Sequence, residues 1–95
     1  MNEYNEFMKI VQGDRTASTY NSYQWNLGNF IDKFNLVTIE DLKKLTTKDI
    51  REYLEELKTA GLQSSSVNTR LRTLKTFFAW LMNEEYIKSN PMTKI

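Results

Sequence analysis

The chain contains neither cysteine nor histidine among its 95 residues. Without cysteine it can form no disulfide framework and no thiolate metal site. Without histidine it lacks the commonest general base and a very common metal ligand. There is also no glycine-rich phosphate loop and no cluster of metal-ligating side chains. The sequence therefore predicts no catalytic residue, no metal and no cofactor for this chain.

Long apolar runs and targeting signals are missing too. The longest apolar run, residues 77–82, is far too short to span a bilayer. The N-terminus shows no basic stretch followed by an apolar one, so no secretory signal is visible. We therefore expect a cytoplasmic protein with no membrane partner.

Residues that break helices are scarce, with three glycines and one proline. The apolar residues recur at helical spacing almost throughout, and no segment alternates for long as a strand would. Hydrophobic residues make up 40% of the chain, which is enough for a single modest core. We predict one all-α domain over residues 1–95, without repeats or an internal boundary.

The helix boundaries follow from caps and breakers. Thr16 is a candidate N-cap, Thr38 and Thr46 each open a capping-box pattern, and Gly61 suits the position just after a helix. The predicted helices are 3–12, ended by Gly13 and Asp14, then 17–34, a short turn from 39 to about 45, 47–60, and 64–84. This gives four full helices joined by short connecting turns.

The charge distribution is uneven although the net charge is only +1. Residues 1–60 hold ten acidic and eight basic side chains, whereas residues 61–95 hold two acidic and five basic ones. In the helix predicted at 64–84, Val67, Leu71, Leu74, Phe78 and Leu81 form an apolar stripe. The opposite side of this helix is polar and cationic, which suits contact with a nucleic-acid backbone.

One arc of this helix collects the candidate DNA contacts. Arginine and lysine neutralise phosphates, while asparagine, serine and threonine bond phosphate oxygens or base edges. An ordinary solvated face is the competing interpretation. On the arc lie Ser65, Asn68, Thr69, Arg72, Lys75 and Thr76, with Arg70 on the opposite flank.

The start of this helix has two interpretations. Ser64, Ser65 and Ser66 can simply cap it. Alternatively, because no acidic residue follows them, the free N–H groups and the positive helix end are available to an external phosphate.

The helix predicted at 17–34 has a second polar face, formed by Ser18, Asn21, Ser22, Trp25 and Asn29. For Trp25 we favour packing against a neighbouring element, with an exposed binding surface as the alternative. Trp80 carries the same ambiguity.

Several motifs occur in an order that resembles one family. They are Thr19-Tyr20 with Tyr23, Leu27 and Phe30, then LTTKDIREYL at 45–54, GLQSSSVNTRL at 61–71, LKTFFAWL at 74–81 and Asn90-Pro91. Together they resemble the N-terminal half of a tyrosine recombinase of the phage integrase or Xer type.

The resemblance implies a four-helix, SAM-like orthogonal bundle that acts as a core-binding domain. It implies that residues 17–34 and 65–84 face the major groove of double-stranded DNA. The family's catalytic domain would lie after Pro91, so this chain alone should not cut or join DNA. The resemblance further implies that the parent protein acts as a tetramer on DNA, whereas the isolated domain is expected to be monomeric.

Two other functions stay open at this point. One is a helical protein-interaction module with Trp25 and Trp80 as anchors. The other is a small orphan DNA-binding protein without recombinase activity. Salt-dependent binding of duplex DNA separates DNA binders from a protein-interaction module.

Overall fold

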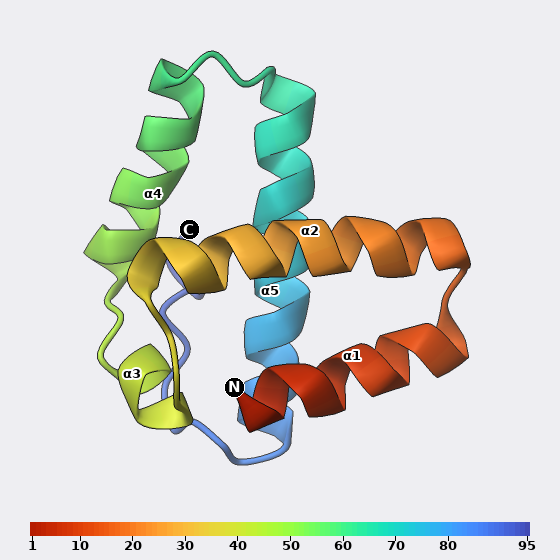
Figure 1. Cartoon of the computed structure of the whole chain (residues 1–95). Coiled ribbons are helices and arrows are strands. Elements are labelled where there is room, and N and C mark those ends of the chain that lie inside the picture. Colours follow the sequence, from red (N-terminus) through yellow and green to blue (C-terminus); the bar gives the residue numbers. More distant parts are fainter. The chain divides into compact units, whose positions relative to one another are not determined.

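The computed structural model describes residues 1–95 and is entirely helical, with no strand. The helices are α1 (Asn2–Asp14), α2 (Ala17–Phe34), α3 (Ile39–Lys43), α4 (Thr47–Thr59) and α5 (Ser64–Asn83) (Figure 1). The predicted all-α class is confirmed, with α3 as the short turn between the full helices. The chain divides into two compact units, Met1–Lys43 and Lys44–Ile95. No helix combines the length and the apolar character that a bilayer span requires.

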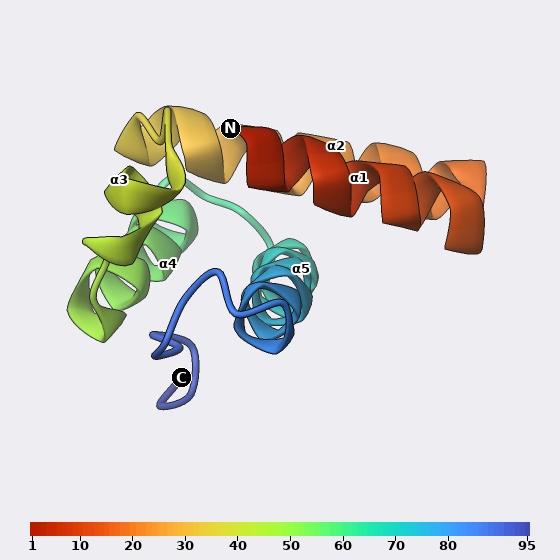
Figure 2. The ribbon, with the colours of Figure 1, turned by 90° about the horizontal axis from the view of Figure 1, so that it is seen from below.

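In the first unit, α1 and α2 form an antiparallel helical hairpin, and the two views show them side by side (Figures 1 and 2). Phe7 of α1 stacks on Tyr23 of α2 with ring centroids 6.2 Å apart. The Arg15 guanidinium lies 5.9 Å from the centre of the same Tyr23 ring. Burial raises the pKa of Tyr4, and the nearby Tyr20 and Asp32 raise it further. A raised pKa is the opposite of what activates a phenol as a nucleophile.

The ends of α1 and α2 follow local chemistry. The Thr16 hydroxyl accepts a hydrogen bond from the Thr19 N–H at 3.2 Å, which confirms Thr16 as the N-cap of α2. Helix α2 ends at Asn35, whose φ of 53° lies in the left-handed region. The prediction that Gly13 and Asp14 end α1 is wrong, because both remain helical and the chain turns extended only at Arg15.

In the second unit, α4 and α5 form another antiparallel hairpin, followed by the non-helical segment 84–95 (Figures 1 and 2). That segment is fixed to α4 by two hydrogen bonds. The Thr47 hydroxyl donates to the Pro91 carbonyl at 2.8 Å, and the Arg51 guanidinium donates to the Lys94 carbonyl at 3.2 Å. The core of this unit is apolar and aromatic, and its most buried side chains are Ile50, Leu74, Phe77, Phe78 and Leu81.

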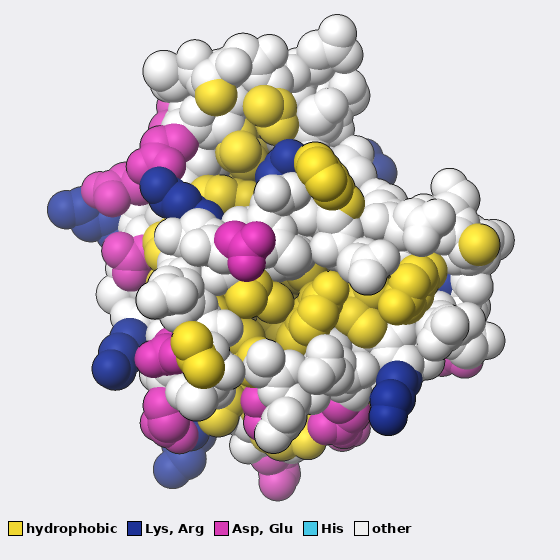
Figure 3. Space-filling model, in the orientation of Figure 1, with side chains coloured by type: hydrophobic (Ala, Val, Ile, Leu, Met, Phe, Trp, Pro, Cys, Tyr) yellow, Lys and Arg dark blue, Asp and Glu magenta, His cyan; other side chains and the backbone are white.

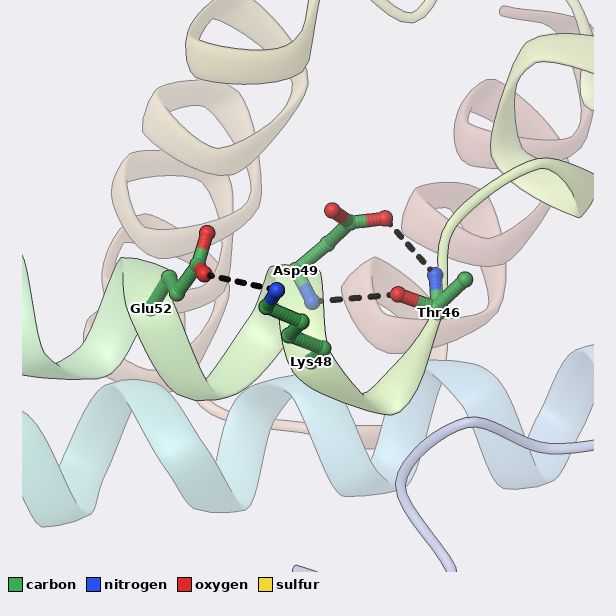
Figure 4. A network of polar contacts seen from close by, with 4 residues as sticks. All are labelled: Thr46, Lys48, Asp49 and Glu52. Atoms are coloured by element: carbon green, nitrogen blue, oxygen red, sulfur yellow. Dashed lines mark hydrogen bonds and ion pairs between the residues drawn. The ribbon is translucent and has the colours of Figure 1, made fainter.

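Helix α4 begins with the predicted capping box (Figure 4). The Thr46 hydroxyl accepts from the Asp49 N–H at 3.2 Å, and the Asp49 carboxylate accepts from the Thr46 N–H at 2.9 Å. At the other end, Gly61 has a φ of 95°, which confirms it as the glycine after the helix. At α3 only the carboxylate half of such a box is present, because Asp41 accepts from the Thr38 N–H at 3.0 Å.

The capping box predicts a stability effect. Replacing Thr46 with alanine leaves the Asp49 N–H without its acceptor and should lower the free energy of unfolding by about 1 kcal/mol. Urea denaturation followed by circular dichroism measures this loss. Thr59→Ala, at the exposed last position of α4, is the matched control and should change stability by less than about 0.5 kcal/mol. Equal effects of the two changes would contradict a capping role for Thr46.

Candidate nucleic-acid interface

The polar face of α5 presents two cations that have no partner within the chain. Arg72 and Lys75 are exposed, and neither makes an ion pair, whereas Lys43, Lys48 and Lys58 pair with acidic side chains. They are three residues apart, so they lie on the same side of the helix. Because exposed cations are already solvated, they can exchange water and counterions for a phosphate at little cost. This face therefore has the chemistry of a phosphate-binding surface.

Arg70 has a different environment from the other two cations. It is half-buried, and its guanidinium donates to the Tyr53 hydroxyl of α4 at 3.3 Å. Since Tyr53 is 5% exposed, this bond ties Arg70 to the seam between α4 and α5. Arg70 therefore differs from Arg72 and Lys75 in having part of its donor capacity used inside the protein.

The hydroxyl and amide groups on the α5 arc differ in what they can offer. Thr69 donates to the Ser65 carbonyl at 2.9 Å, and Thr76 donates to the Arg72 carbonyl at 3.0 Å. With their hydrogens used within the helix, these threonines offer only acceptor lone pairs. Such acceptors suit base amino groups and not phosphate oxygens. The Ser65 and Asn68 side chains are exposed and make no hydrogen bond within the chain.

The start of α5 overturns one interpretation of its serines. The N-cap residue is Gln63, and no side chain makes a capping hydrogen bond there. Ser64, Ser65 and Ser66 are the first three residues of the helix itself, so the expectation that they act as caps is wrong. The first turn also lacks an acidic residue, unlike the first turn of α4.

The outer face of α2 is poor in cations, because residues 17–32 contain neither lysine nor arginine and the exposed Lys33, in the last turn, is the one cation of the helix. Ser18 and Asn21 are exposed, while Ser22 is half-buried and accepts a hydrogen bond from Asn26 at 3.5 Å. Trp25 is 67% exposed, so the favoured interpretation that it packs against a neighbour is wrong. Figure 3 shows mostly uncharged side chains over α2, whereas acidic and basic ones mix over α4.

Trp80, unlike Trp25, packs against neighbouring side chains. It is half-buried and stacks on Phe77 with ring centroids 6.4 Å apart and an angle of 12° between the rings. Its ring centroid lies 5.7 Å from that of Tyr86. Trp80 is therefore part of the aromatic packing at the end of α5, which removes it as a freely exposed partner anchor.

Sequence reasoning missed one feature of α2. A shallow hollow on its outer face is lined by Asn21, Gln24, Trp25, Gly28, Asn29 and Asp32. Gln24 and Gly28 were not singled out from the sequence, although a glycine in the middle of a helix is a signal that could have found the hollow. Of the α5 candidates, Arg70 thus lies at the seam with α4, apart from Arg72 and Lys75. Of the α2 candidates, Asn21 and Trp25 line the hollow, whereas Ser18 and Ser22 do not.

Comparison with known proteins identifies the family of this chain. Residues 2–85 match the phage integrase N-terminal SAM-like domain. The chain is 29% identical over 92 residues to the tyrosine recombinase XerC of Listeria monocytogenes, with 95% of this chain and 31% of the relative covered. It is also 29% identical over 92 residues to the tyrosine recombinase XerD of Rickettsia prowazekii, with 95% of this chain and 29% of the relative covered. The tyrosine recombinase XerC of Oceanobacillus iheyensis is 29% identical over 91 residues, with 94% of this chain and 30% of the relative covered.

The chain thus spans less than a third of the length of these curated relatives. No solved structure matches it. The family match extends from the start of α1 through the end of α5 and so includes every helix described above. This chain belongs to the phage integrase N-terminal SAM-like domain family, to which its motifs at 45–54, 61–71 and 74–81 already pointed.

Proposed function

We propose that this chain binds double-stranded DNA as the core-binding domain of a tyrosine recombinase, in DNA integration and recombination. The observation that carries the proposal is the α5 face, where Arg72 and Lys75 are exposed and unpaired with no acidic residue elsewhere in the helix. Two cations that no carboxylate neutralises attract a polyanion, and both project from one side of the helix, so they can contact the same phosphate backbone.

The remaining α5 candidates take secondary roles in this proposal. Asn68 and Ser65 bond phosphate or base edges, and Thr69 and Thr76 accept hydrogen bonds from bases. Arg70 orients α5 through Tyr53 and reaches DNA only if that bond opens. Ser18, Asn21, Ser22 and Trp25 are the contacts from α2.

The wider assembly also belongs to the proposal. Because the chain covers less than a third of the recombinases that it matches and belongs to an N-terminal domain family, we assign the cutting and joining of DNA to a catalytic domain of the parent protein. The chain itself is then a binding domain and not an enzyme. The parent works as a tetramer on DNA in the cytoplasm, and the isolated domain is a monomer.

Salt dependence tests the α5 contacts one at a time. Each phosphate contact releases counterions, so the logarithm of affinity falls with the logarithm of salt concentration by about 0.9 per contact. Arg72→Ala and Lys75→Ala should each reduce the steepness of that slope by about one. Fluorescence anisotropy with labelled duplex DNA over a range of salt concentrations measures it. A variant with the wild-type slope would remove its residue from the interface.

A protein-interaction module remains the second candidate because Trp25 is 67% exposed. Exposed tryptophans are common anchors of protein interfaces. This function predicts no measurable duplex binding even at low salt. Steeply salt-dependent binding of the isolated chain would exclude it as the main activity.

A further inference from the structure

The first half of α5 is packed less firmly than its second half. The helix begins without a side-chain capping bond. Over its first two turns Val67 is the one buried residue, and Leu71 in the next turn is half-buried. In the second half, by contrast, Phe77, Phe78 and Leu81 are fully buried. Apolar contacts alone therefore fix the orientation of the first half only weakly.

A directional bond fastens this part of α5 to α4. The Arg70 guanidinium donates to the Tyr53 hydroxyl at 3.3 Å. Because Tyr53 is buried, its hydroxyl is held in a fixed place on α4. Apolar contacts have no preferred direction and let a helix turn about its axis, whereas a hydrogen bond depends on the angle between donor and acceptor. The bond therefore sets how the first half of α5 is rotated against α4.

That rotation determines where the two exposed cations of α5 point. Successive residues of a helix are turned by about 100°, so Arg72 and Lys75 lie about 200° and 140° around the axis from Arg70. A rotation that separates Arg70 from Tyr53 therefore swings both cations in the opposite direction on the far side of the helix. Their alignment with a phosphate backbone then depends on a bond in which neither takes part.

The chemistry of the acceptor keeps the helix cationic. Arg70 is half-buried and makes no ion pair within the chain, since its partner is a phenol and not a carboxylate. A carboxylate at this position would also hold Arg70, but it would cancel one of the three positive charges of α5. The phenol supplies the direction of the bond and leaves the attraction for a polyanion intact.

We infer that Tyr53 is a positioning residue for DNA binding. Through Arg70 it holds the first half of α5 in the rotation in which Arg72 and Lys75 reach the phosphates, and it touches no DNA itself. The inference rests on the proposed DNA-binding function and extends the residues that govern affinity to a buried side chain of α4.

Tyr53→Phe tests the inference because it deletes the hydroxyl and keeps the ring. The variant should bind a labelled duplex about fivefold more weakly, since only part of its population has α5 in the binding rotation. The dependence of affinity on salt should keep the wild-type slope, because no phosphate contact is lost. Tyr23→Phe is the matched control, because the Tyr23 hydroxyl makes no hydrogen bond within the chain, and it should bind like the wild type.

Arg70→Met deletes the same bond from the other side. Alone, it should weaken binding about as much as Tyr53→Phe. Combined with Tyr53→Phe, it should cost little more, because the bond is already absent. If Arg70 instead contacted a phosphate directly, the two losses would add, and Arg70→Met would reduce the salt slope by about one. Anisotropy titrations at several salt concentrations measure both quantities, and thermal melts establish that each variant is folded at the titration temperature.

Hydrogen exchange of the free protein locates the loosened segment. In Tyr53→Phe and in Arg70→Met, the amides of residues 67–73 should exchange faster than in the wild type. The amides of residues 77–82 should keep their protection, because the aromatic core of the unit is unchanged. Uniformly faster exchange throughout α5 would show general destabilisation and would contradict a positioning role.

The outcomes separate this inference from the proposed function. Tyr53→Phe binding like Tyr23→Phe, or losses that add in the double variant, would overturn the inference, while salt-dependent binding would still support the proposed function. Tighter binding of Tyr53→Phe with a steeper salt slope would also overturn it, by showing that Tyr53 keeps Arg70 away from a phosphate. Failure of the wild type to bind any duplex at low salt would overturn both.

Discussion

Replacing Phe78 with alanine is expected to lower the free energy of unfolding by about 3–5 kcal/mol. Phe78 is fully buried, and its ring meets that of Phe77 edge to face, with centroids 6.0 Å apart and 64° between the rings. Truncation removes the buried ring and its contact with Phe77, and it leaves a cavity in the core. Domains of this size are typically stable by about 5–15 kcal/mol, so the loss is a large share of the total.

Trp25→Ala provides the control for this measurement. It deletes a larger side chain, yet Trp25 is 67% exposed and borders solvent. We expect a change of about 0.5 kcal/mol or less, as for other surface substitutions. Both variants are measured by urea denaturation followed by far-UV circular dichroism, which does not depend on tryptophan fluorescence. A large loss of unfolding free energy for Trp25→Ala, together with a small loss for Phe78→Ala, would contradict the exposure of Trp25 and the burial of Phe78.

Helix boundaries were predictable where a side chain bonds to the backbone within one turn. Thr16 and the pair Thr46 and Asp49 fix the starts of α2 and α4 by contacts three residues apart, which a sequence pattern can show. The ends of α1 and the start of α5 were not decided in this way. Gly13 stays helical, and Gln63 is the N-cap without any side-chain bond, so composition alone was misleading there.

Burial of polar residues was harder to predict than burial of apolar ones. Thr73 is 1% exposed although it lies outside the predicted apolar stripe, because its hydroxyl donates to the Thr69 carbonyl at 3.0 Å and is thereby satisfied. Leu71, which belongs to that stripe, is only half-buried. Periodicity identifies the buried side of a helix, but the exact width of that side depends on which neighbours cover it.

For the candidate site, the sequence likewise predicted exposure along one helix but not contacts between helices. Helical projection alone indicated that Arg72 and Lys75 would be exposed, and the structure confirms this. It could not reveal the bond between Arg70 and Tyr53, because these residues lie on different helices. Nor could it decide whether Trp25 packs, since a tryptophan opposite an apolar stripe is buried only if another element covers it.

Reversing the two α5 cations should have the largest effect on binding. Arg72→Glu combined with Lys75→Glu is expected to weaken duplex binding at low salt by about a hundredfold or more. Hydrogen bonds to charged groups contribute about 1.5–3 kcal/mol each, and two are lost while repulsion of the phosphates is added. Both side chains are exposed and free of ion pairs, so the fold should retain its stability. Anisotropy titrations and a thermal melt of the same sample measure both quantities.

The matched control makes the same change of net charge on α4. Lys48 and Lys58 are exposed by 84% and 58% and pair with Glu52 and Glu55 at 3.9 Å and 3.4 Å. Exposed pairs of this kind contribute little to stability, so Lys48→Glu with Lys58→Glu should also fold. If total charge governed binding, both double variants would weaken it equally. Because the proposed contact is local to α5, we expect the α4 variant to lose less than about tenfold, an effect of long-range charge that salt screens.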